Sequence, residues 1–103
     1  MERVGLVLNG VDEMAIEITG FVKVELEDKT YKIGAEDFSC EESDDRHIGD
    51  GDFQYECLYV YHHSEGFSVM FQLTMTGSDI NIYEPNATNG AIIIVNQLNA
   101  RKK

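Results

Sequence analysis

Carboxylates are the side chains of this 103-residue chain that are most able to act on something outside it. Between Lys32 and Arg101 the sequence holds twelve Asp and Glu but a single basic residue, Arg46, and nine of those acids lie between Glu36 and Glu56. The net charge is -11, and like charges held close together destabilise a folded chain by mutual repulsion. A positively charged partner would offset that cost, so the pattern predicts an acidic binding module.

Clustered carboxylates also suit calcium, and one stretch approaches a calcium-binding loop. An EF-hand loop that begins at Asp45 would place Glu56 at its twelfth position, where Glu is required. Asp50 then stands where Gly is required, and two further ligand positions lack oxygen-bearing side chains. The match therefore fails. A looser pair at Asp50 and Asp52 is the remaining alternative, although hard cations need more than two converging oxygens.

Thiols and imidazoles are the other reactive groups of the chain. The residue types suit zinc but lack paired cysteine spacing; they are Cys40, His47, Cys57, His62 and His63. Nucleophilic catalysis by a Cys–His pair is disfavoured, because surrounding acids raise the pKa of a thiol whereas activation requires a lower one. No spacing singles out two carboxylates for glycoside hydrolysis. We expect no metal, no cofactor and no enzymatic activity.

Direct binding of nucleic acid is also disfavoured. Affinity for nucleic acid comes from Lys and Arg that neutralise phosphates, and the only basic cluster is the short tail at residues 101–103. No Gly-rich phosphate loop is present, and an Asp in Gly49–Gly51 would repel a phosphate.

The rest of the composition indicates a soluble protein that we expect to be cytoplasmic. The chain starts without the features of a secretory signal, and no apolar run approaches the roughly 20 residues that cross a bilayer. We therefore expect no contact with a membrane. Cys40 and Cys57 fit either a reduced pair or one disulfide, and the absence of a signal favours free thiols.

Alternation by two is the strongest periodic signal in the first third of the chain. Residues 14–26 place apolar side chains on even positions and mainly polar ones on odd positions, which is typical of a strand. Gly20 interrupts this strand and predicts a bend at which it passes between two sheets or turns a barrel corner. Turn signals at Asn9–Gly10 and Asp28–Lys29 complete a meander of about three strands over residues 1–33.

The second half predicts four further strands, over residues 53–63, 67–75, 80–83 and 91–98. In the second of these, the large apolar side chains share one face: Phe67, Val69, Phe71, Leu73 and Met75. Tyr59 is expected to pack inside, and the apolar run of 91–98 is typical of a strand buried on both sides. Seven short strands without a helical stripe predict one mainly-β domain, 1–103, folded as an antiparallel sandwich or small barrel.

The longest connection, residues 34–52, is predicted to be an acidic loop. Nineteen residues is long for a turn in a compact domain, and such loops are usually functional or disordered. Phe38 and Phe53 flank the acids as candidate apolar anchors, with Tyr55 as a further contact. The predicted partner-binding residues are Glu36, Asp37, Phe38, Glu41, Glu42, Asp44, Asp45, Asp50, Asp52, Phe53 and Tyr55. The alternative is a solvated loop whose acids only maintain solubility.

In size and charge the chain resembles the small immunity proteins that bacteria pair with secreted nuclease toxins, including those of contact-dependent growth inhibition. It is also similar to phage-encoded inhibitors that imitate nucleic acid. The resemblance implies that carboxylates of residues 41–52 occupy positions that phosphates would take in a basic active site.

The resulting hypothesis is an acidic immunity or inhibitor protein that neutralises a basic partner, with a nuclease toxin as the leading candidate. We expect the protein to be a monomer or a weak homodimer. Opposite charges across such an interface set the rate of association and the choice of partner. The alternative is an assembly module of a phage or mobile element that oligomerises through the strand edges at Ile80–Tyr83 or Ile92–Val95.

Overall fold

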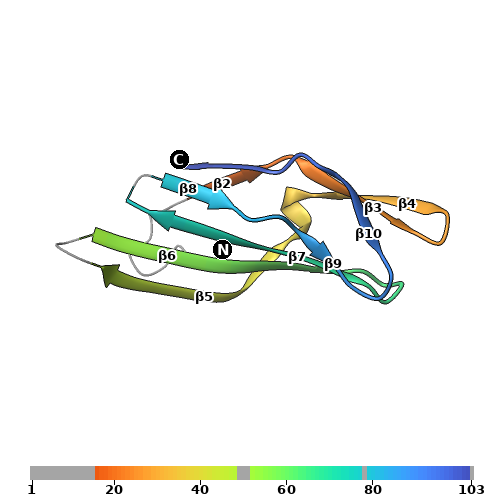
Figure 1. Ribbon diagram of the computed structural model, residues 1–103, viewed down its shortest axis with the longest axis horizontal. Coiled ribbons are helices and arrows are strands. Elements are labelled where there is room, and N and C mark those ends of the chain that lie inside the picture. Colours follow the sequence, from red (N-terminus) through yellow and green to blue (C-terminus); the bar gives the residue numbers. More distant parts are fainter. Residues whose placement is uncertain (1–15, 49–51, 78, 103) are drawn as a thin grey trace.

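The computed structural model describes residues 16–48, 52–77 and 79–102, with the backbone alone for residues 46–48, 52 and 53. This part of the chain is a mainly-β sandwich in which every strand pairing is antiparallel, as the sequence predicted (Figure 1). It contains ten strands, whereas about seven were expected over the whole chain, because the strand at 14–26 is divided at Gly20 and the strands at 39–48, 86–87 and 99–102 were not predicted. The predicted strand Val4–Leu8 and the turn at Asn9–Gly10 lie outside the described residues.

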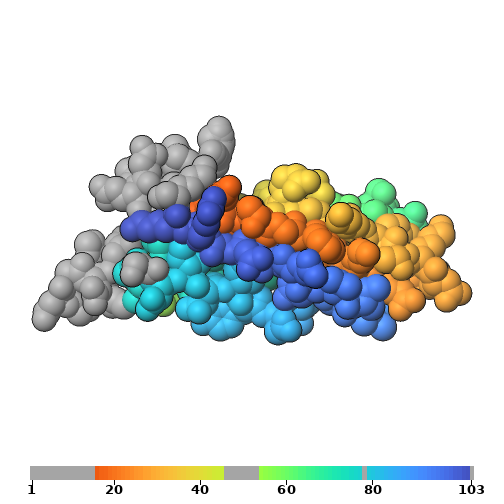
Figure 2. Space-filling model, turned by 90° about the horizontal axis from the view of Figure 1, so that it is seen from above, coloured from red at the N-terminus to blue at the C-terminus, as the bar shows by residue number. Residues whose placement is uncertain are grey.

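One layer is built from two bent strands that run side by side along the molecule (Figure 2). β2 (Ile16–Thr19) pairs with β11 (Asn99–Lys102) in a two-stranded sheet. β3 (Phe21–Leu26) then pairs with β10 (Ile92–Asn96) on one side and β4 (Lys29–Gly34) on the other. The predicted strand pattern of residues 14–26 therefore serves two sheets in succession.

Gly20 makes this change of sheet possible, as the sequence predicted. Its φ of +100° lies in a region that L side chains rarely adopt, and an added Cβ would stand 1.8 Å from the carbonyl oxygen of Gln97. Backbone bonds hold the bend: Gln97 donates to the Phe21 carbonyl at 2.9 Å, and Ala35 donates to the Gly20 carbonyl at 3.0 Å. Only Gly allows the two bent strands to approach this closely.

The other layer is a five-stranded sheet. Its strands are β5 (Ser39–Ile48), β6 (Asp52–His62), β7 (Ser68–Thr76), β8 (Asp79–Ile82) and the short β9 (Asn86–Ala87), which pairs with β7. A tight turn joins β6 to β7, where His63 donates to the Phe67 carbonyl at 2.8 Å. β5 is an edge strand and lies along the lower side of the molecule in Figure 1.

The hydrophobic core lies between the layers. Val22, Val24 and Ile33 from the three-stranded sheet meet the alternating face of β7. The apolar residues predicted for this face are all buried: Phe67, which directly precedes β7, and Val69, Phe71, Leu73 and Met75 within it. Tyr59 stacks on Phe71 with ring centroids 5.2 Å apart, which confirms its predicted packing role. Alternation by two therefore selects the inward face of the central strand correctly.

The predicted acidic loop at 34–52 is wrong over most of its length. Gly34 belongs to β4, residues 35–37 form the 3₁₀ turn η2 (Ala35–Asp37), and residues 39–48 form β5. Because the residues of β5 are mostly polar or charged and show no apolar alternation, the sequence pattern did not predict a strand here. A strand at a sheet edge, however, can carry charge on both of its faces, because the partner strand supplies the apolar side chains.

The prediction that the run at 91–98 is buried on both sides is also wrong. β10 is an edge strand among the strands described, and Ile92 and Ile94 are 60% and 47% exposed. The strand also ends at Asn96, and β11 begins at Asn99, beyond the predicted run. No helix in the described ranges is long and apolar enough to cross a bilayer.

Candidate binding surface on the acidic edge strand

β5 is held in place by its antiparallel partner β6. The register runs from Ser39 opposite Val60 to Ile48 opposite Asp52, with a bulge between Cys40 and Glu42. From Glu42 to the end of the strand the pairing is regular. β6 is rich in aromatic and β-branched residues, which favour strands, so it provides the template on which the acidic segment pairs.

Alternation along β5 places carboxylates on both faces of the sheet. Glu42 and Asp44 lie opposite Leu58 and Glu56 on the outer face. Asp45 lies opposite Tyr55 on the face that carries the core. The acidic segment therefore carries carboxylates on both faces of the sheet edge.

Four of the predicted contact residues lie together on β5 with exposed side chains: Glu41, Glu42, Asp44 and Asp45. We call these four residues the β5 carboxylates. Glu36 and Asp37 are also exposed but belong to η2, where the Asp37 carboxylate accepts a bond from the Gly34 backbone N–H at 3.2 Å. They are therefore not part of the same strand edge.

Two predicted apolar contacts are corrected by the structure. Phe38 is 8% exposed and packs edge-on against Phe71, with ring centroids 5.1 Å apart. Tyr55 is 7% exposed and belongs to the same core. Both lie next to acids in sequence, but their side chains point between the layers, so neither can anchor a partner.

Burial also alters the acidity of the tyrosines under β5. Desolvation by burial raises the pKa of Tyr59 to about 12, with a smaller contribution from Tyr55. The pKa of Tyr55 is likewise raised, first by burial and then by the negative charge of Asp45. Both phenols therefore stay neutral at physiological pH and add no charge to the edge.

Asp50, Asp52 and Phe53 are the remaining predicted contact residues. Asp50 lies outside the described residues. Asp52 and Phe53 begin β6, and only their backbone is described.

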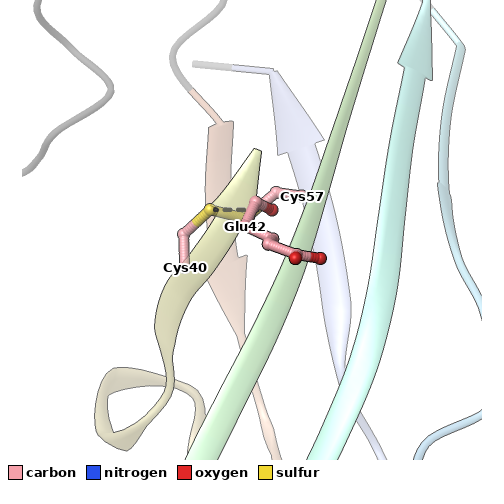
Figure 3. Close-up of a disulfide and its surroundings, with 3 residues drawn as sticks. All are labelled: Cys40, Glu42 and Cys57. Atoms are coloured by element: carbon pink, nitrogen blue, oxygen red, sulfur yellow. Dashed lines mark hydrogen bonds between the residues drawn. A yellow bond between two sulfur atoms is a disulfide. The ribbon is translucent and has the colours of Figure 1, made fainter. Parts of the chain in front are cut away.

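A disulfide joins β5 to β6, contrary to the expectation of free thiols (Figure 3). The Cα atoms of Cys40 and Cys57 are 6.0 Å apart, within the usual range for such a bond. Cys40 lies at the bulge, and its sulfur is 3.7 Å from the carbonyl oxygen of Glu42, while Cys57 is buried. Neither sulfur is a nucleophile in this state, so the Cys–His pairing considered in the sequence does not exist.

A hydrogen-bonded chain across three strands was not predicted. Nε2 of His62 lies 2.9 Å from the Glu41 carboxylate, and its Nδ1 lies 2.9 Å from the Ser68 hydroxyl. A proton on Nε2 satisfies both contacts, because Nε2–H donates to Glu41 and Nδ1 accepts from Ser68. The tight turn after His62 already implied that His62 and Ser68 face each other, but only the fold brings Glu41 to them.

Glu41, His62 and Ser68 follow one another as an acid, an imidazole and a hydroxyl, the order found in an acid–base–nucleophile set. The side chains of His62 and Glu41 are 65% and 44% exposed, so water competes for each contact. We interpret these three hydrogen-bonded side chains as a structural contact that connects the bulge of β5 to β6 and β7.

The outer face beside β5 has one shallow hollow of about 320 Å³. It is lined by Glu42, Ser43, Asp44, Glu56, Leu58 and Gln72. The hollow combines carboxylates with the apolar side chain of Leu58, a combination that suits the long aliphatic stem and charged end of Lys or Arg. Within the described ranges no group of three or more His, Cys, Asp or Glu is arranged to hold a metal ion.

Comparisons with protein-family models, with curated proteins and with solved structures found no match for this chain.

Proposed function

We propose that this protein is an acidic immunity or inhibitor protein that binds a basic partner and covers the cationic active site of that partner. A nuclease toxin is the leading candidate for the partner. The observation that carries the proposal is the row of exposed β5 carboxylates, Glu41, Glu42, Asp44 and Asp45, along one sheet edge. A nuclease must hold a polyanion, so its active site is basic and offers a complementary surface.

The way in which β5 is held supports the proposal. A carboxylate on a mobile loop loses conformational freedom when it binds, which reduces affinity. β5 is paired with β6 along its length, joined to it by the Cys40–Cys57 disulfide and tied through Glu41 to His62. Its charges are therefore arranged before a partner arrives.

The test measures inhibition of nucleic-acid cleavage by a panel of basic nuclease domains from bacterial toxins. A basic protein of similar size that is not a nuclease serves as the binding control. We expect the variant E41Q/E42Q/D44N/D45N to associate with its target roughly 100-fold more slowly at low ionic strength, because electrostatic steering is lost. The rate for the wild-type protein should fall steeply as salt is added.

A matched variant separates position from total charge. E25Q/E27Q/D28N/E65Q removes the same number of exposed acids from β3, the β3–β4 turn and the β6–β7 turn. We expect this variant to keep most of the inhibition. Equal loss in both variants would show that only net charge matters, and a wild-type protein that inhibits no member of the panel would contradict the proposal.

One observation favours the second candidate, an assembly module that oligomerises through strand edges. Ile92 and Ile94 are exposed on the edge strand β10, and Tyr83 is 55% exposed beyond the edge strand β8. Association through such apolar residues is insensitive to salt. Self-association that persists at high ionic strength, with no inhibition of nucleases, would favour this function.

A further inference from the structure

β5 is the longest edge strand of the described sheets. Among the strands that the structure describes, only β6 pairs with it. The peptide groups on its other side thus form an edge that a further strand can join. When an extended peptide adds to such an edge, main-chain hydrogen bonds provide affinity and the neighbouring side chains provide specificity.

The charges beside this edge define which peptide fits. Side chains of an added strand alternate between the two faces of the sheet. On the outer face they would stand beside Glu42 and Asp44, and on the opposite face beside Asp45. Beside residues 42–45, a Lys or Arg therefore meets a carboxylate on either face. An amphipathic strand would instead place its apolar side chains against a carboxylate.

The same charges argue against a second copy of this chain as the added strand. Two β5 strands paired over residues 42–45 would bring Glu42 of each strand opposite Asp45 of the other, and like charges directly opposite destabilise cross-strand pairing. The bulge between Cys40 and Glu42 further limits regular pairing to residues 42–48. The occupant is therefore a short extended segment of opposite charge.

We infer that β5 accepts, by strand addition along residues 42–48, an extended segment with Lys or Arg at the consecutive positions that lie beside residues 42–45. This inference rests on the proposed function, because the segment belongs to the basic partner. It adds how the partner binds and which kind of sequence is recognised.

The experiment compares synthetic peptides that differ only in their backbone. The first is a short peptide composed of Lys and Arg, and the second has the same side chains with its central backbone nitrogens methylated. Methylation removes the donors needed for a strand ladder and keeps the charge. We expect the methylated peptide to bind roughly ten-fold more weakly or worse, and the unmodified one to protect β5 amides from hydrogen exchange.

Variants of the protein test the role of the two faces. D45N and E42Q each remove one carboxylate from one face of β5, and both should weaken binding of the Lys–Arg peptide. E25Q on β3 makes the same charge change away from this edge and should leave binding unchanged. A peptide with Lys at alternate positions and Ser between them should bind more weakly than the Lys–Arg peptide.

Three outcomes would overturn the inference. Equal binding of the methylated and unmodified peptides would show attraction by charge alone, and the proposed function would survive. Failure of both peptides to bind, while basic nucleases are still inhibited, would exclude strand addition, and the proposed function would again survive. A dimer in which β5 amides are protected without any peptide would identify a second copy as the occupant.

Discussion

β5 and β10 are both edge strands with a bulge, yet they differ in what they expose. β5 presents Glu41, Glu42, Asp44 and Asp45, and its bulge lies between Cys40 and Glu42. β10 presents Ile92 and Ile94, and its register shifts between Ile93 and Val95. A bulge interrupts the regular ladder that another strand would need, so both edges share one means of limiting unwanted pairing.

Charge is the second means, and only β5 uses it. Repulsion between carboxylates disfavours pairing of residues 42–45 of β5 with the same residues of a second copy, whereas a basic segment would be attracted to them. β10 lacks this selectivity, because apolar side chains accept any apolar surface. In principle, an edge can disfavour pairing with its own copy and still accept a segment of opposite charge.

The two edges are also held differently, and the largest expected effect concerns the bend beside β10. We expect Gly20→Ala to lower the free energy of unfolding by about 4 kcal/mol, as the sum of a positive-φ penalty and overpacking. The new Cβ would meet the Gln97 carbonyl, which belongs to the backbone and cannot rotate away. Denaturant unfolding followed by circular dichroism measures the loss.

Gly66→Ala is the matched control for that prediction. Gly66 has a φ of +102°, close to that of Gly20, but a Cβ there would meet nothing within 4 Å. We expect a loss of only about 1 kcal/mol, from the backbone conformation alone. Equal losses in the two variants would mean that the close approach at Gln97 does not hold the bend.

The next effect concerns the disulfide that holds β5. Its removal in C40A/C57A, or by reduction, should lower the free energy of unfolding by about 3 kcal/mol, because the bond closes a loop with a sequence separation of 17. Hydrogen exchange should increase at β5 amides and stay nearly unchanged at β10 amides. The comparison of the edges breaks down if protection falls equally in both strands.

The smallest effect on stability is expected at the exposed side chains of β10. I92K/I94K should change the free energy of unfolding by no more than about 0.5 kcal/mol, because both side chains are largely in water. The added charges should suppress any self-association of the wild-type protein, as judged by sedimentation velocity. The variant E41Q/E42Q/D44N/D45N makes the opposite change at β5 and should increase self-association. A large loss of stability in I92K/I94K would show that these residues are covered in solution.

Much of the fold was predictable from local patterns. The inward face of β7, the bend at Gly20 and the antiparallel arrangement all follow from alternation by two and from the conformational freedom of Gly. The β5 strand was missed because its ten residues carry no apolar alternation. β5 pairs with the next strand of the chain, β6, and the aromatic and β-branched residues that favour a strand lie in β6 and not in β5.

The candidate site was predictable in composition but not in shape. The acids of residues 41–45 were correctly expected to be exposed, while Phe38 and Tyr55 were expected outside and are buried. An aromatic residue beside acids can face either layer, and strand register makes that choice. The contacts of His62 with Glu41 and Ser68 likewise need three strands brought together.

Residue types and their spacing within single segments were enough to specify the strand-rich class, the apolar face of β7 and the large excess of negative charge. Three features became visible only in the folded chain: the acids line a sheet edge, Cys40 and Cys57 meet, and β10 exposes isoleucines. Those features depend on which strand lies beside which, and that order arises from contacts between residues far apart in the chain.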